Sequence, residues 1–166
     1  MTRSQSFSAF LKYFSKEKLP VTLSEENVTY FSNRNPPIPQ ELIRRFIAQS
    51  TTEEDDEYTE YIACCKIPKT DKIHALVYWK GGLLSYEYVL VTYNKNGVII
   101  DRKVIAGTKS DGNSIIHSVA TIDENWIVNV VVGQQKESEK FYDPAGSKNM
   151  SLELMANGEI TFSLDQ

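Results

Sequence analysis

The chain has 166 residues, of which 41% are hydrophobic and 24% are charged, and its formal net charge is −4. This length supplies one domain with a sizeable core, and the proportions are ordinary for a globular protein. A mildly acidic chain without clustered lysine and arginine argues against nucleic-acid binding, which needs cations along the phosphate backbone. No apolar run approaches the roughly 20 residues of a membrane-spanning helix. We therefore expect neither nucleic acid nor membrane as a partner.

The first predicted element is a short N-terminal helix. Its apolar stripe consists of Phe7, Phe10, Leu11 and Phe14, spaced i, i+3, i+4 and i+7. The helix ends before Pro20, because the residue before a proline favours extended backbone. The stripe either docks in a partner's groove or packs on the protein's own sheet, and we favour the second interpretation.

A proline-rich connection, residues 21–40, leads to a second helix. We expect a short strand at Val28–Phe31 within this connection. The segment Asn35–Pro39 excludes both a helix and a central strand. Glu41–Ala48 then predicts a short amphipathic helix, with apolar residues on one face and two arginines on the other.

An acidic run follows, within residues 50–57. Its five consecutive acids are Glu53, Glu54, Asp55, Asp56 and Glu57. They repel one another and cannot be buried unpaired, so the run predicts a surface loop. Three interpretations remain: a solvated linker, a docking patch for a basic partner, or a weak site for a hard cation. The spacing and the glycine of an EF-hand loop are absent.

From Tyr58 to the C-terminus the hydrophobic period is two residues, which predicts strands. The first lies near residues 58–67, and seven more follow at Ile73–Trp79, Leu84–Tyr93, Val98–Ile105, Ile115–Ile122, Trp126–Gly133, Met150–Met155 and Ile160–Leu164. Gly81-Gly82, Asn94–Gly97 and Asn157-Gly158 predict hairpin turns. We expect Ile73–Ile105 at the centre of the sheet and residues 106–113 as a polar loop.

Two helices before a run of locally connected strands are the α+β pattern. We expect one domain, residues 1–166, with a helical lead-in over residues 1–57. An antiparallel meander of about eight strands occupies residues 58–166. The sheet is expected to curve strongly around the helices or to close into a barrel.

No catalytic or cofactor motif is present. His74 and His117 alternate with apolar neighbours in predicted strands and are too few for a zinc site. Cys64 and Cys65 are adjacent; in a strand they point to opposite faces, so a disulfide between them would be strained. No nucleophile elbow or glycine-rich phosphate loop occurs. We expect a protein without enzymatic activity, cofactor or metal, and a reduced, cytoplasmic location, since residues 1–20 lack the apolar core of a signal peptide.

The predicted sheet is rich in aromatic residues. Tyr78, Tyr86, Tyr88 and Trp126 combine an apolar body with a polar tip, which suits a ligand pocket or a protein interface. Ordinary cross-strand packing is the third interpretation. Eight strands are just enough to enclose one small ligand, so the aromatic residues also support a small-molecule carrier or sensor.

The order of these motifs carries a resemblance. The motifs that carry it are Phe7-x-x-Phe10-Leu11-x-x-Phe14, then Leu19-Pro20, then Thr92–Gly97 and Ile99–Asp101. In these motifs the chain resembles a group of small uncharacterised bacterial α+β proteins. The chain is also similar in general character to bacterial toxin-immunity proteins, which are small and acidic and lack catalytic residues. No activity follows from the first likeness. The absence of catalytic and cofactor motifs, together with the acidity of the chain, leads us to expect a non-enzymatic module that binds a protein, such as a toxin it neutralises. The acidic run at residues 53–57 would attract a basic partner.

Overall fold

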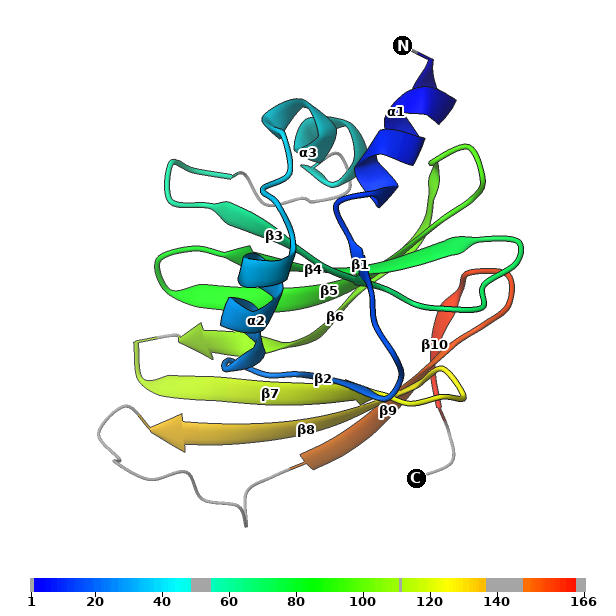
Figure 1. Cartoon of the computed structure of the whole chain (residues 1–166). Coiled ribbons are helices and arrows are strands. Elements are labelled where there is room, and N and C mark those ends of the chain that lie inside the picture. The colour runs from blue at the N-terminus through cyan, green and yellow to red at the C-terminus, as the bar shows by residue number, and fades with distance from the viewer. Residues whose placement is uncertain (1, 49–54, 111, 137–147, 164–166) are drawn as a thin grey trace.

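The structure is a computed structural model of the chain, and it describes residues 2–48, 55–110, 112–136 and 148–163. The helices are α1 (Arg3–Leu11), α2 (Asn27–Arg34) and α3 (Gln40–Phe46). The strands are β1 (Ser15–Lys16), β2 (Val21–Leu23), β3 (Glu60–Lys66), β4 (His74–Gly81), β5 (Ser85–Tyr93), β6 (Ile99–Ser110), β7 (Ser114–Ile122), β8 (Ile127–Lys136), β9 (Lys148–Leu154) and β10 (Ile160–Phe162). Figure 1 shows α1 and α3 above the sheet and α2 in front of it.

In the described part of the chain, ten strands form one sheet with the order β1-β3-β4-β5-β6-β7-β8-β9-β10, while β2 lies off this path and pairs with β7. Every pairing is antiparallel except that of β1 with β3. The predicted α+β meander is confirmed, and each of the eight predicted strands is present. The two additional strands, β1 and β2, were not predicted because each has only two or three residues.

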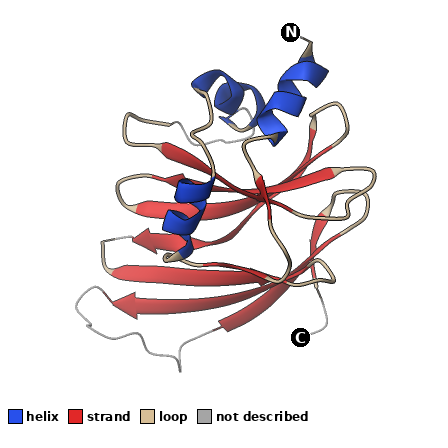
Figure 2. Ribbon diagram, in the orientation of Figure 1, coloured by secondary structure: helices blue, strands red, loops and turns tan. Residues whose placement is uncertain are grey.

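The expectation of a barrel or a strongly curved sheet is wrong. β6 pairs with β7 only through Gly107–Ser110, whereas β2 pairs with Ala120–Ile122 at the other end of β7. Because β2 occupies that part of β7, the first half of β6 diverges from it. The sheet stays open, with β1 and β10 at its two ends, and Figure 2 shows its two halves as an upper and a lower group of strands.

The expectation of two helices is also wrong, because the connection contains a third. The predicted strand at Val28–Phe31 lies inside α2. Its valine, threonine and aromatic residues favour a strand locally. In the helix, however, Val28 and Phe31 are three residues apart on one face; Phe31 is buried and Val28 packs against the same core. Tertiary packing therefore overrides local propensity.

Two apolar cores lie on opposite faces of β3, β4 and β5. The outer core joins α1 and α3 to these strands through Phe7, Phe10, Phe46, Tyr78 and Tyr93, among others. The expected packing of the Phe7 stripe on the protein's own sheet is confirmed. The inner core contains residues of both halves of the sheet together with Phe31 of α2.

A β-bulge in β3 places both cysteines in the inner core. The register of β3 on β4 shifts between Ala63 and Cys65, so Cys64 is an extra residue. Cys64 and Cys65 are both buried in the inner core, while Ala63 packs in the outer one. The expectation that the two cysteines point to opposite faces is therefore wrong, and both thiols are free.

The predicted polar loop at residues 106–113 is largely strand. β6 continues to Ser110, and its last four residues pair with β7. Gly107 marks the change, with a φ of 151°. A side chain there would meet the backbone of Tyr86 and Glu87 on β5, so this position requires glycine. None of the described helices is long and apolar enough to cross a membrane.

Candidate functional site

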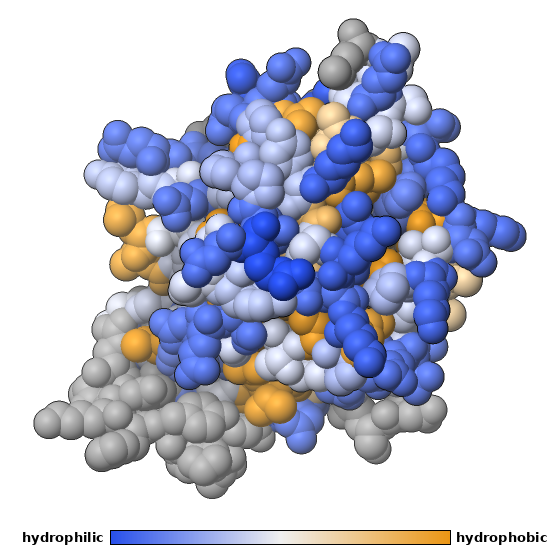
Figure 3. Space-filling view, in the orientation of Figure 1, coloured by the Kyte–Doolittle hydropathy of each residue, from blue (hydrophilic) through white to orange (hydrophobic). Residues whose placement is uncertain are grey.

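The turn between β4 and β5 exposes two leucines. Gly82 N donates a hydrogen bond to Ser85 O at 2.9 Å, which closes the turn around Leu83 and Leu84. Leu83 is 70% exposed and Leu84 is 74% exposed, the highest values among the large hydrophobic residues of the described ranges. Figure 3 shows apolar surface at the left edge of the molecule, where Figure 1 places this turn.

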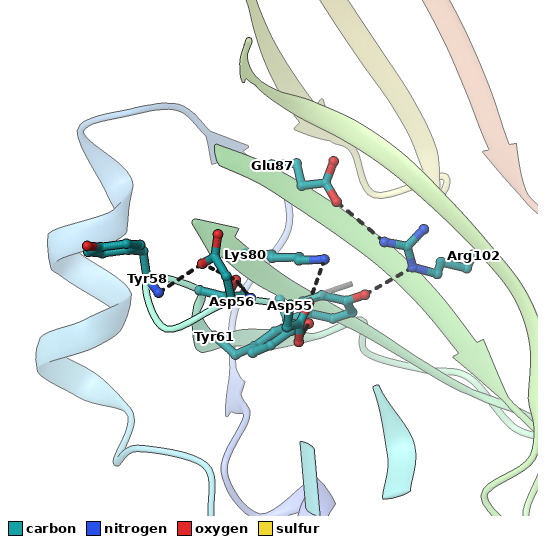
Figure 4. Close-up of polar contacts among 9 residues, drawn as sticks. Asp55, Asp56, Tyr58, Tyr61, Lys80, Glu87 and Arg102 are labelled. Atoms are coloured by element: carbon teal, nitrogen blue, oxygen red, sulfur yellow. Dashed lines mark hydrogen bonds and ion pairs between the residues drawn. The ribbon is translucent and has the colours of Figure 1, made fainter. Parts of the chain in front are cut away.

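The described part of the acidic run lies beside this turn. Asp55, Asp56 and Glu57 are all exposed, whereas Glu53 and Glu54 lie outside the described residues. Asp56 Oδ1 accepts hydrogen bonds from Tyr58 N at 2.8 Å and from Thr59 Oγ1 at 3.3 Å. This local turn holds the segment, and Tyr58 is 53% exposed (Figure 4).

Asp55 attaches the acidic segment to the sheet. Its carboxylate lies 3.1 Å from Lys80 Nζ and accepts a hydrogen bond from Tyr61 OH at 2.6 Å. The Lys80 ammonium also lies over the Tyr61 ring, 5.8 Å from its centroid. Burial, together with the bond to Asp55, raises the pKa of Tyr61 far above its usual range, so its hydroxyl stays protonated and donates. The segment is thus fixed to β3 and β4.

A second polar group stiffens the neighbouring strands. Arg102 Nε on β6 donates to Tyr78 OH at 3.1 Å, and its terminal nitrogen lies 3.4 Å from Glu87 Oε1 on β5 (Figure 4). Burial raises the pKa of Tyr78, so this residue is a neutral acceptor here. The tyrosines of both groups are held neutral, which suits structural support and not acid–base chemistry.

The leucine turn and the acidic segment enclose one cleft. Its volume is about 440 Å³, and its lining includes Asp56, Thr59, Lys80, Glu87 and the turn from Gly81 to Ser85. We call Leu83, Leu84 and the segment from Asp55 to Tyr58 the hairpin surface. It combines exposed apolar side chains with a carboxylate rim on a fixed support.

Three of the four predicted pocket aromatics, Tyr86, Tyr88 and Trp126, belong to or contact the inner core, and the rings of Tyr86 and Tyr88 meet edge-on with centroids 6.4 Å apart. Tyr78 is buried in the outer core, in the same cluster as Phe7, Phe10 and Phe14. Tyr88 is buried on the inner face. Tyr86 stacks on Trp79, with ring centroids 5.9 Å apart, and Trp126 lies in the turn before β8 at a φ of 64°. Trp126 lines one cavity and Tyr86 lines a different one.

The histidines and cysteines have structural contacts. His74 packs edge-on against Phe7, with centroids 5.5 Å apart, and His117 Nδ1 lies 3.0 Å from Thr108 Oγ1. Burial raises the pKa of Cys65 to about 12 and also raises that of Cys64, so both thiols are poor nucleophiles. Over the described ranges, no group of three or more histidine, cysteine or acidic residues is placed to hold a metal ion.

Sequence reasoning identified the acidic half of the hairpin surface but missed its apolar half. The period-two pattern places Leu84 at the start of the predicted strand Leu84–Tyr93 and predicts no site at Leu83. The signal was present, because two leucines directly after Gly81-Gly82 lie at the tip of the predicted turn, where side chains face solvent. Comparison with protein-family models, curated proteins and solved structures gives no match for this chain.

Proposed function

We propose that the protein is a non-enzymatic module that binds a protein partner through the hairpin surface, in the manner of an immunity-type protein that neutralises a toxin. The observation that carries the proposal is the exposure of Leu83 and Leu84 beside an acidic rim. Adjacent exposed leucines at a turn tip are costly to leave in water, and burying each one contributes about 1.5–3 kcal/mol.

The chemistry of the surface defines the partner. An apolar groove would receive the leucine pair, and a basic rim would face Asp56 and Glu57. Charge complementarity of this kind accelerates encounter and makes the association rate fall with salt. A cytoplasmic location is part of the proposal, since both cysteines are free thiols.

The support of the surface favours tight binding. Asp55 holds the acidic segment to Lys80 and Tyr61, and a backbone hydrogen bond closes the leucine turn. A surface that is already ordered loses little conformational entropy on binding. The hairpin surface is therefore suited to act as a rigid ligand for a groove.

The test compares two double variants of the full chain. Leu83→Ser/Leu84→Ser removes the apolar tip, and Val119→Ser/Val131→Ser is the matched control. This control pair is exposed by 39% and 45% and lies on paired positions of β7 and β8, away from the turn. A partner is identified by quantitative mass spectrometry after affinity purification from the source organism, and its affinity is then measured with purified components.

We expect the leucine double variant to bind at least about 100-fold more weakly, from the loss of two buried side chains. The control variant should bind like the unmodified chain. Glu57→Lys should lower the association rate and flatten its salt dependence, while Glu124→Lys in the β7–β8 turn should not. The proposal fails if no stoichiometric partner is found, or if the leucine and valine variants lose affinity equally.

A further inference from the structure

A basic cavity lies at the end of β3 opposite to the hairpin surface. Its volume is about 310 Å³. The polar side chains that line it are Lys16, Lys66, Lys69, Thr70 and His74. Its other lining residues, Leu76 among them, are apolar. This concentration of cations stands out in a chain whose net charge is −4.

Strand pairing brings two of the lysines together. Lys16 of β1 and Lys66 of β3 are direct partners in the parallel ladder, and Lys66 is also opposite Leu76 of β4. Paired residues point to the same face, and so does His74, two positions before Leu76. The pairing of β1 with β3 therefore brings Lys16 and Lys66 to one cavity, which His74 of β4 also lines.

The β3–β4 turn adds a third lysine. Lys69 has a φ of 65°, a left-handed conformation that costs a non-glycine residue roughly 1–2 kcal/mol. Burial lowers the pKa of Lys66, and the charge of Lys16 adds to the effect. Burial likewise lowers the pKa of His74, with further contributions from Lys95 and Lys66. Lys66 thus interacts electrostatically with both Lys16 and His74.

Among the described residues, no carboxylate is ion-paired with the lysines of this cavity, although Lys69 also lines a neighbouring cavity together with Glu17 and Glu124. Neither Asp nor Glu lines the cavity, and none of the described carboxylates lies within 4.0 Å of the ammonium groups of Lys16, Lys66 or Lys69. Like charges on directly paired strand positions are destabilising. A bound anion would remove this repulsion.

We infer that this cavity binds a small ligand that carries a phosphate or pyrophosphate group. Lysine ammonium groups bind phosphate as point charges, and several of them suit an anion with more than one negative charge. The volume lies at the lower end of the range of small-molecule sites. Leu76 and its apolar neighbours offer a surface for the organic part of the ligand. The inference is independent of the partner proposed for the hairpin surface.

The test is calorimetric titration of the full chain with inorganic phosphate, pyrophosphate and citrate at matched ionic strength. We expect saturable 1:1 binding, tighter for pyrophosphate than for phosphate. Lys16→Gln, at an exposed position, and Lys66→Gln should each weaken pyrophosphate binding at least about tenfold. Lys148→Gln on β9 removes the same charge from an exposed site elsewhere and should change the affinity less than about twofold.

NMR provides a second readout. Pyrophosphate should shift the ring signals of His74 and the amide signals of Lys66, but not those of Leu83 and Leu84. If Lys66→Gln disturbs the fold, as judged by circular dichroism, the exposed Lys16→Gln variant carries the comparison. The inference is overturned by non-saturable binding, by an equal loss in Lys148→Gln, or by citrate binding as tightly as pyrophosphate.

Discussion

At the residue scale, single polar side chains donate hydrogen bonds to backbone carbonyls of the sheet and its turns. Asn35 Nδ2, at the end of α2, donates to Ala63 O at 2.7 Å and to Cys64 O at 2.8 Å. These carbonyls belong to the β3 bulge, where the ladder to β4 shifts register. Thr92 Oγ1 acts similarly, because it donates to Gly158 O at 2.6 Å and ties β5 to the β9–β10 hairpin. Buried backbone groups need such partners.

Replacing Asn35 therefore tests this role. Asn35→Ala removes both hydrogen bonds, while Cys64 O keeps the one from Ser15 Oγ at 3.0 Å, so we expect the free energy of unfolding to fall by about 1–2 kcal/mol. Asn33→Ala, at an exposed position of the same helix, is the control and should change it by less than about 0.5 kcal/mol. Urea unfolding followed by circular dichroism gives both values. An equal effect of the two substitutions would show that the bulge does not depend on Asn35.

At the element scale, the β4–β5 hairpin depends on the packing of the Trp79 ring against Gly81, two residues along the same strand. The Trp79 ring lies over Gly81 and stacks on Tyr86. A Cβ atom at Gly81 would collide with the Trp79 ring, whereas at Gly82 the nearest atom is Ser85 O at 3.9 Å. The two adjacent glycines therefore have different roles, and only the first is required by packing.

This difference predicts that substitution of Gly81 lowers the stability of the fold and that substitution of Gly82 does not. Gly81→Ala should displace the Trp79 ring and lower the free energy of unfolding by about 1–3 kcal/mol. Gly82→Ala should leave it within about 0.5 kcal/mol of the original value. Thermal unfolding followed by tryptophan fluorescence measures both effects, with a change in the emission maximum for Gly81→Ala only. If Gly82→Ala proves the more damaging, the packing of this hairpin is misassigned.

The same scale shows what the sequence could and could not predict. Period-two patterning and the turns at Asn94–Gly97 and Asn157-Gly158 correctly predicted eight strands, because local chemistry sets those features. α2 was missed because burial of Phe31 against the sheet outweighs local strand propensity. β1 could not be predicted from the sequence, because Ser15 and Lys16 form a strand only through their pairing with β3. The acidic rim was predicted from charge alone, but its position beside Leu83 and Leu84 depends on how β3 and β4 pair.

At the scale of the whole molecule, the buried cysteines link stability to pH. An unfolded thiol ionises at about pH 8.5, whereas burial holds the pKa of Cys65 at about 12 and raises that of Cys64. Each thiol is neutral in the fold, so its full contribution to stability is present below pH 8.5. That contribution is lost as the pH rises, because only the unfolded chain ionises freely.

We therefore expect the free energy of unfolding to fall between pH 8.5 and pH 10 by about 2 kcal/mol per thiol. The control is Cys64→Ala/Cys65→Ala, which keeps the tyrosines and removes only the thiol contribution. Urea unfolding at pH 7, 8.5 and 10 should give a steeper decline for the unmodified chain than for this variant. Parallel pH profiles would mean that the thiols are accessible to water in the folded protein.

The two functional proposals concern opposite ends of the same strands. β3 begins beside the acidic rim and ends at Lys66, so carboxylates lie at one end and ammonium groups at the other. The first end presents exposed leucines on a fixed support, and the second presents a cavity of about 310 Å³. One end is thus suited to a protein groove and the other to a small anion.

Site-specific photo-crosslinking in the source organism tests the central claim most directly. A photoreactive phenylalanine analogue is placed at Leu84 on the hairpin surface or at Val131, an exposed position of β8. Irradiation should link the Leu84 derivative to one protein at high yield, and an excess of the unmodified chain should suppress this product. The Val131 derivative should give no such product. Equal crosslinking from both positions, or none from Leu84, would contradict a partner-binding role for the hairpin surface.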